Sequence, residues 1–136
     1  MPDEATATHP GGCFCGAVRY VATGAPLNVR ICHCQMCRKL TSSAFFARAM
    51  FPSEAVTMSG PVARFHSSED LERLFCPACS TLVGVQRVSR PDLFGITLGS
   101  LDDPNALAPE CHVWTSAKVD WLVLDDGLPQ YLEGAP

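Results

Sequence analysis

The sequence predicts a mostly β fold of short, mainly antiparallel strands that is stapled at clustered cysteines. Short segments of alternating hydrophobic and polar residues recur along the chain, as is typical of half-buried strands. The 11 prolines and 10 glycines fit the many turns that such a fold needs. No stretch has the pattern of an amphipathic helix of three turns. These features favour one domain of short strands.

The length and composition set the class of protein. The 136 residues suffice for one domain with a modest core that profits from metal staples. We expect a loose leader over residues 1–10 and a single domain over residues 11–136. The start has no signal-peptide pattern, and no apolar run is long enough to cross a bilayer. We therefore expect a cytoplasmic protein with no membrane partner.

The expected strands are separated by turn residues. A strand over residues 71–75 is favoured over a short helix at 67–70, because it must deliver Cys76 to a metal. Gly60 and Pro61 are expected to turn a hairpin between two neighbouring strands. The full set of expected strands is 17–23, 27–31, 45–51, 56–59, 62–66, 71–75, 81–87, 94–98, 111–115 and 119–124.

The eight cysteines point to metal rather than to disulfides. In a reducing compartment, short C-x-C and C-x-x-C spacings are typical of metal ligands, and a disulfide framework is the weaker alternative. A redox role for C-x-x-C is also weak, because the strand-then-helix context of a thioredoxin-like motif is not expected here. Two local pairs far apart in sequence predict a closed structural zinc site, and these are Cys13, Cys15, Cys76 and Cys79.

Three further thiols, Cys32, Cys34 and Cys37, form a second cluster, called the trio below. Three thiolates leave one position on a tetrahedral zinc, and such a zinc suits another soft thiolate better than hydroxide. The fourth ligand could be substrate, water, Cys111 or His112. Neighbours on a strand alternate, so only one of Cys111 and His112 can face the trio.

Charge is unevenly distributed along the chain. The net charge is -4, which argues against nucleic acid as a partner. Residues 5–53 nevertheless contain no Asp or Glu and carry five cations. These cations either offset the thiolates or line a pocket for an anionic substrate, and both can hold. They are Arg19, Arg30, Arg38, Lys39 and Arg48.

Several motifs resemble one known family. The segment GCFCGAVRY opens the domain, CHCQMCR contains the trio, and FCPAC contains the second cysteine pair. Together with GSLD, HVWTS and DGLP, they resemble the glutathione-dependent formaldehyde-activating family, also called the centromere protein V family. The matching segments are residues 12–20, 32–38, 75–79, 99–102, 112–116 and 126–129.

The resemblance implies a fold, two zinc ions and an activity. It implies an Mss4-like fold, with a structural zinc on the four paired cysteines and a catalytic zinc on the trio. The implied activity joins glutathione to formaldehyde. The enzyme class is named carbon–sulfur lyase after the reverse reaction, in which the adduct is cleaved. Ser80 stands where the family usually has glycine, so we expect a strained turn there. Ser42 and Ser43 replace a Gly-containing loop, and Cys111 lies outside the family's cysteine pattern.

The sequence thus predicts a zinc enzyme that acts on adducts of a glutathione-like thiol with a small aldehyde. His112 is the predicted proton donor to the oxyanion. Arg38, Lys39 and Arg48 are predicted to contact the thiol's carboxylates. The alternative is a non-catalytic two-zinc scaffold that binds another protein. The sequence gives no oligomeric state.

Overall fold

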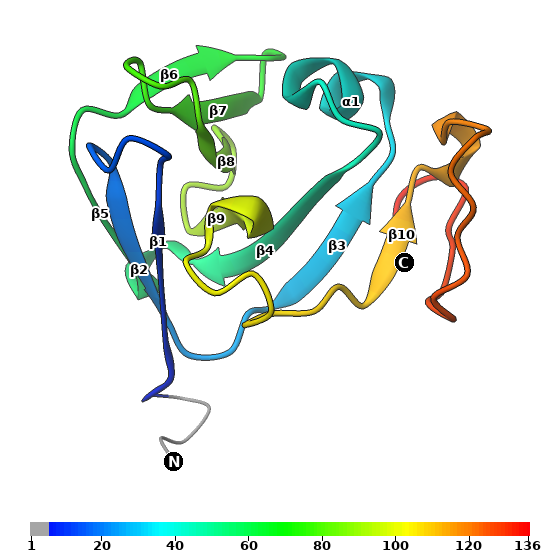
Figure 1. The fold of residues 1–136 in the computed structure, drawn as a ribbon, viewed down its shortest axis with the longest axis horizontal. Coiled ribbons are helices and arrows are strands. Elements are labelled where there is room, and N and C mark those ends of the chain that lie inside the picture. The colour runs from blue at the N-terminus through cyan, green and yellow to red at the C-terminus, as the bar shows by residue number, and fades with distance from the viewer. Residues whose placement is uncertain (1–5) are drawn as a thin grey trace.

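The computed structural model describes residues 6–136, which form two β-sheets (Figure 1). The smaller sheet is antiparallel, in the order β1-β2-β5. Its strands are β1 (Thr8–Gly12), β2 (Arg19–Thr23) and β5 (Val56–Ser59). Within the described residues, no helix has the length and hydropathy needed to cross a membrane.

The larger sheet has seven strands in the order β10-β3-β4-β9-β8-β7-β6. Every pair is antiparallel except β10 and β3, which are parallel. The predicted mostly β class is therefore confirmed. The strands are β3 (Asn28–Cys32), β4 (Phe46–Pro52), β6 (Ala63–His66), β7 (Leu71–Phe75), β8 (Leu82–Arg87), β9 (Leu93–Thr97) and β10 (Cys111–Val113).

The main core joins the two sheets. Tyr20 of the smaller sheet and Phe51 and Ile96 of the larger one are almost fully buried in a single cluster. The Tyr20 hydroxyl lies 2.7 Å from Ser100 Oγ, so its polar end is paired inside that core. Because Cys13 and Cys76 belong to the same cluster, one cysteine group is built into the junction of the sheets.

Three sequence predictions about the backbone are wrong. Residues 8–10, expected in a loose leader, pair with β2 as part of β1, while residues 1–5 lie outside the described part. The strands at 56–59 and 62–66 form no hairpin, because β5 pairs with β2 and β6 with β7. Gly60, at φ +103°, carries the chain from one sheet to the other. Residues 119–124 form a turn and irregular chain instead of a strand.

A short helix, α1 (Gln35–Thr41), follows β3 and was not predicted. Cys34 is its N-cap, and the Cys34 sulfur accepts the backbone N–H of Cys37. The helix ends at Ser42, whose φ of 53° is left-handed. With only seven residues and three small or polar residues after it, α1 is too short to give a clear helical period. Short 3-10 turns also lie at Ser53–Ala55, Leu98–Ser100 and Thr115–Ala117.

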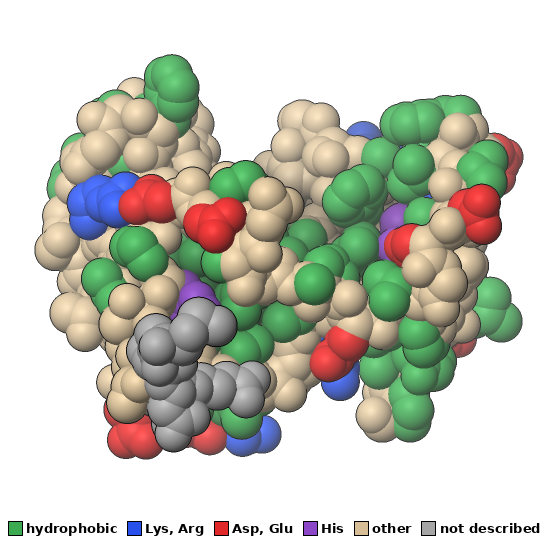
Figure 2. Space-filling view, turned by 60° about the horizontal axis from the view of Figure 1, so that its bottom comes forward, with side chains coloured by type: hydrophobic (Ala, Val, Ile, Leu, Met, Phe, Trp, Pro, Cys, Tyr) green, Lys and Arg blue, Asp and Glu red, His purple; other side chains and the backbone are tan. Residues whose placement is uncertain are grey.

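The C-terminal segment, residues 114–135, returns along β10 and is drawn in orange and red in Figure 1. Backbone hydrogen bonds hold it, among them Tyr131 N–H to His112 O and Trp114 N–H to Glu133 O, both 2.9 Å. Its large side chains contribute little, since Trp121 and Val123 are 74% and 81% exposed. Figure 2 shows hydrophobic side chains gathered on this part of the surface. The segment is therefore fixed by hydrogen bonds more than by apolar packing.

Candidate metal centres and the adjoining cavity

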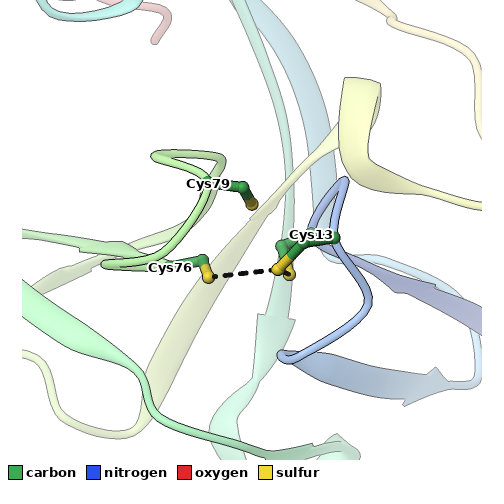
Figure 3. A group of neighbouring side chains, drawn as sticks. Cys13, Cys76 and Cys79 are labelled. Carbon is green, nitrogen blue, oxygen red and sulfur yellow. Dashed lines mark hydrogen bonds between the residues drawn. The ribbon is translucent and has the colours of Figure 1, made fainter.

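The first cysteine group joins two loops that are far apart in sequence. Cys13 and Cys15 come from the β1–β2 loop, and Cys76 and Cys79 from the β7–β8 turn, with all four Sγ atoms within 4.8 Å of one another. The side chains of Cys13, Cys76 and Cys79 turn toward one shared space (Figure 3). Cys15 Sγ lies 3.6 Å from Cys13 Sγ and 3.8 Å from Cys76 Sγ. Zinc–sulfur bonds of about 2.3 Å in a tetrahedron require sulfur atoms about 3.8 Å apart, so the donors fit zinc.

The surroundings of Cys13 and Cys79 favour thiolates. A backbone hydrogen bond with Ala17 lowers the pKa of Cys15, but the neighbouring thiols, Cys13 first, raise it to about 11. The backbone N–H of Val18 donates to Cys13 Sγ at 3.2 Å and lowers the pKa of Cys13. Thr81 Oγ1 lies 3.2 Å from Cys79 Sγ and accepts the Phe14 N–H at 3.1 Å. The Thr81 hydrogen bond is the main cause that lowers the pKa of Cys79 to about 5. Deprotonated sulfur is the form that binds a metal.

The trio lies where β3 ends and α1 begins. Cys32 is the last residue of β3, Cys34 is the helix cap and Cys37 is in the first turn, with the three Sγ atoms within 4.8 Å of one another. Hydrogen bonds, with Cys32 first and then Cys34 and Arg73, lower the pKa of Cys37 to about 5. The pKa of Cys32 is raised in turn, mainly by its hydrogen bond with Cys37. The donor set fits a metal ion with three thiolate ligands.

Among the described residues, no fourth Cys, His, Asp or Glu joins the trio at this distance. Cys111 pairs in register with Arg30, and His112 with Ile31, so the two side chains lie on opposite faces of the sheet. His112 is on the face away from Cys32. The structure thus does not bring the predicted proton donor, His112, together with the trio.

His112 instead belongs to a hydrogen-bonded chain of three residues. Its Nε2 lies 2.7 Å from Asp126 Oδ2, and its Nδ1 lies 2.9 Å from His33 Nε2. An ionised carboxylate only accepts, so His112 donates through Nε2, and a neutral His112 then accepts the His33 N–H. Burial lowers the pKa of His33, and the His112 hydrogen bond lowers that of Asp126. This network ties the C-terminal segment to the backbone between Cys32 and Cys34.

A cavity of about 830 Å³ adjoins the trio. Ligand pockets of 300–1,000 Å³ are usual for small molecules. Its described lining includes the trio and five arginines but no Asp or Glu, so the lining is cationic. The apolar part of the wall includes Phe46 and Trp114. The arginines are Arg30, Arg48, Arg73, Arg87 and Arg90.

One of the three cations predicted to contact the thiol lines this cavity. Arg48 lines the cavity, whereas Arg38 and Lys39 lie on α1 outside its lining. Arg30, opposite Arg48 in the β3–β4 register, lies on the same face as Cys32; it was counted among the cations of the charge window but was not predicted as a contact to the thiol. Arg73 was also missed, because no local pattern indicates that β7 faces the trio.

The environment of Cys34 and Cys37 also corrects the argument about redox motifs. This C-x-x-C pair follows a strand and opens a helix, which is the context that was not expected from the sequence. Its membership in a three-sulfur group still favours metal binding, since Cys32 lies within the same 4.8 Å. All eight cysteines are free in the structure.

Known proteins support the same interpretation. The sequence profile of the glutathione-dependent formaldehyde-activating enzyme family matches residues 8–117. An uncharacterized lyase of Schizosaccharomyces pombe is 33% identical over 73 residues, which cover 54% of this chain and 53% of the relative's length. The chain thus matches about half the length of that relative.

The fold has a counterpart among solved structures. A crystal structure of a Rhodobacter sphaeroides protein has a TM-score of 0.55 at 21% identity, and the match covers 90% of this chain and 98% of that one. This likeness concerns the fold alone. The profile match, which covers most of the chain, shows that the chain belongs to the glutathione-dependent formaldehyde-activating enzyme family.

Proposed function

We propose that the protein is a zinc-dependent carbon–sulfur lyase-type enzyme that forms and cleaves the adduct of glutathione, or a similar anionic thiol, with formaldehyde or a related small aldehyde. The observation that carries the proposal is a three-thiol group at the wall of a cationic cavity, with no fourth donor among the described residues. The family and the lyase name of a relative agree with it. A metal ion on the trio would supply a soft centre that favours the thiolate form of the substrate.

The arginines of β3 and β4 provide the recognition of anions. Arg30 and Arg48 are cross-strand partners on the cavity wall, and like charges in such positions repel. Among residues 6–136, the Arg48 side chain donates only to the neutral amide of Asn28, at 2.5 Å, and both burial and Arg30 lower the pKa of Arg48. Arg30 Nε is buried without a hydrogen-bond partner. A substrate carboxylate between these guanidinium groups would relieve the repulsion and accept their hydrogen bonds.

The overall reaction neither takes up nor releases a proton, so it consumes no separate acid. The thiol sulfur forms a bond to the carbonyl carbon, the carbonyl π bond breaks, and the proton that the thiol gives up ends on the carbonyl oxygen. His112 is not assigned that transfer, because its ring lies on the other face of the sheet. We further propose one zinc ion in each cysteine group and a cytoplasmic location, where free thiols stay reduced.

The test is the rate at which formaldehyde exchanges with its glutathione adduct at equilibrium, measured by ¹³C exchange NMR on protein with two zinc ions per chain. We expect the protein to accelerate this exchange. Mercaptoethanol, which has no carboxylate, should be a much poorer substrate. Arg48→Met should lower kcat/KM for glutathione by about 10- to 100-fold, the value of one charged hydrogen bond. Lys39→Met, which removes a cation outside the cavity, is the matched control.

Two results would contradict the proposal. If the zinc-loaded protein left the exchange rate unchanged, the alternative of a two-zinc scaffold would be favoured. If mercaptoethanol and glutathione reacted equally well, and Arg48→Met behaved like Lys39→Met, the arginines would not recognise the thiol.

A further inference from the structure

Arg73 is a buried cation whose position needs an explanation. It lies in the middle of β7, only 3% exposed, and contributes to the cavity wall beside the trio. Arginine is rarely buried to this degree without a charged partner. Removing a guanidinium from water is costly unless an anion and hydrogen bonds compensate for it.

The contacts of Arg73 contain no carboxylate. Its Nε donates to Ser67 Oγ at 3.2 Å, and its guanidinium carbon lies 5.4 Å from the centre of the Phe46 ring. Its Nη2 donates to Cys37 Sγ at 3.8 Å, while Nη1 is buried with no hydrogen-bond partner. The ion pairs found among residues 6–136 do not include Arg73. Cys37 is therefore the one contact that can carry a negative charge.

The trio has a charge that matches this cation. Three thiolates and one divalent ion carry a net charge of -1, in a place where Cys37 is only 6% exposed. A buried net charge of this kind requires an opposite charge nearby. Two other arginines of the wall have carboxylate partners: Arg87 lies 3.5 Å from Asp70, and Arg90 lies 2.9 Å from Asp92. Arg30 and Arg48 have none among residues 6–136, but of the wall arginines only Arg73 has a hydrogen bond to a sulfur of the trio in that part of the chain.

We propose that Arg73 is the counter-charge of the trio: by hydrogen bonding to Cys37 it stabilises an anionic three-thiolate metal group in a buried position. It is a positioning residue and does not itself contact the reacting carbon. The metal group and Arg73 together would then be neutral, so an anionic thiol would meet no uncompensated like charge beside the trio. The inference rests on the proposed metal site of the trio.

The competing explanation is that Arg73 only fills space against Phe46. The two explanations differ in which property of the side chain matters. Under the counter-charge proposal, Arg73→Lys retains most of the effect and Arg73→Met loses it, although Met fills the volume well. Under the packing explanation, both variants perturb the site to a similar extent.

The experiment measures zinc release from the whole protein in a titration with a coloured chelator, with two zinc ions per chain at the start. Arg73→Met should lower the affinity of the trio for zinc by about 10- to 100-fold, the usual effect of replacing a residue that supports a metal ligand. The zinc of the four-cysteine group is the internal control and should be unchanged. Arg87→Met removes an exposed arginine from the same cavity wall. This variant should bind both zinc ions with the same affinity as the unchanged protein.

A second readout does not depend on turnover. In protein with cobalt in the trio, the visible spectrum should report binding of mercaptoethanol, and Arg73→Met should weaken that binding while Arg73→Lys restores most of it. Equal zinc affinity in Arg73→Met and the unchanged protein would overturn the inference. So would loss of both zinc ions, because Arg73 would then support the fold. If instead the unchanged protein held only one zinc, the proposed function itself would fail.

Discussion

At the scale of single residues, Ser80 illustrates how a departure from the family pattern is visible in the backbone. Its φ of 69° lies in the left-handed region, which costs an L-residue with a Cβ about 1–2 kcal/mol relative to glycine. The sequence predicted a strained turn at this position, and the backbone agrees. The turn persists because Cys76 and Cys79 must converge on Cys13 and Cys15, and the Ser80 N–H bonds to Cys76 O at 2.8 Å.

We therefore expect Ser80→Gly to stabilise the protein by roughly 1 kcal/mol, since glycine adopts this conformation without strain. The measurement is the midpoint of thermal unfolding with both metal groups loaded. Ser43→Gly is the control, because Ser43 is not among the residues with positive φ and glycine there only adds freedom to the unfolded chain. Equal destabilisation by both changes would show that the left-handed turn stores no strain.

Single residues of the site were predictable to different degrees. The seven cysteines follow from spacing, because C-x-C and C-x-x-C pairs bring their sulfurs together through local backbone alone. Arg48 was found through the charge window. Arg73 and His33 depend on which strands become neighbours and with what register, and a single sequence carries no local signal for that.

At the scale of elements, the sequence located most strands but not their partners. The expected strands match β2, β4, β7, β8 and β9 to within about two residues. The pairing of β5 with β2 and of β10 with β3 joins distant parts of the chain, and periodicity does not report on it. The predicted strand at 119–124 has an apolar sequence, yet Trp121 and Val123 stay exposed, and Lys118 Nζ donates to the carbonyl oxygens of Val119 and Leu122.

Asp126 of the C-terminal segment leads to a testable prediction. Asp126 Oδ2 accepts from His112, and Oδ1 accepts from the Leu128 N–H at 3.0 Å, so this carboxylate anchors the returning chain. Asp126→Asn should speed hydrogen exchange of amides such as Tyr131 N–H by roughly 3- to 10-fold, the equivalent of one hydrogen bond. Asp125→Asn, at an exposed neighbour with the same charge, is the control.

The same contact has a defined pH dependence. The pKa of Asp126 is lowered in the folded protein, chiefly by His112. Its contribution is therefore present above the pKa of an unfolded Asp, about 3.9, and is lost as the pH falls through the lower folded value. Exchange in Asp126→Asn should lack this acid-dependent step. An identical step in both proteins would assign it to another group.

At the scale of the whole molecule, the two cysteine groups differ in what they hold together. The four-cysteine group connects the β1–β2 loop to the β7–β8 turn and lies in the core between the sheets. The trio is local to β3 and α1. Loss of metal from the four-cysteine group would affect the packing of both sheets. Loss of metal from the trio would affect one wall of the cavity.

We expect chelator to remove metal in two steps, the trio first, with circular dichroism unchanged until the second step. Four thiolates hold zinc more firmly than three, and the binding energy of a structural zinc is folding energy. Cys32→Ser should keep one zinc and the folded spectrum, whereas Cys76→Ser should lose the fold. If the circular dichroism spectrum changed when the first zinc was released, the trio would not be the group that loses its metal first without unfolding.

The parallel pairing of β10 with β3 has a consequence for synthesis of the chain. Cys111 pairs with Arg30, about 80 positions earlier, so β3 remains an edge strand until that late part of the chain has left the ribosome. Cys32, Cys34 and Cys37 are complete as a ligand set long before the neighbouring strand arrives. In the nascent chain these three thiols would therefore lie at an open edge, where a metal ion captured early would protect them from oxidation.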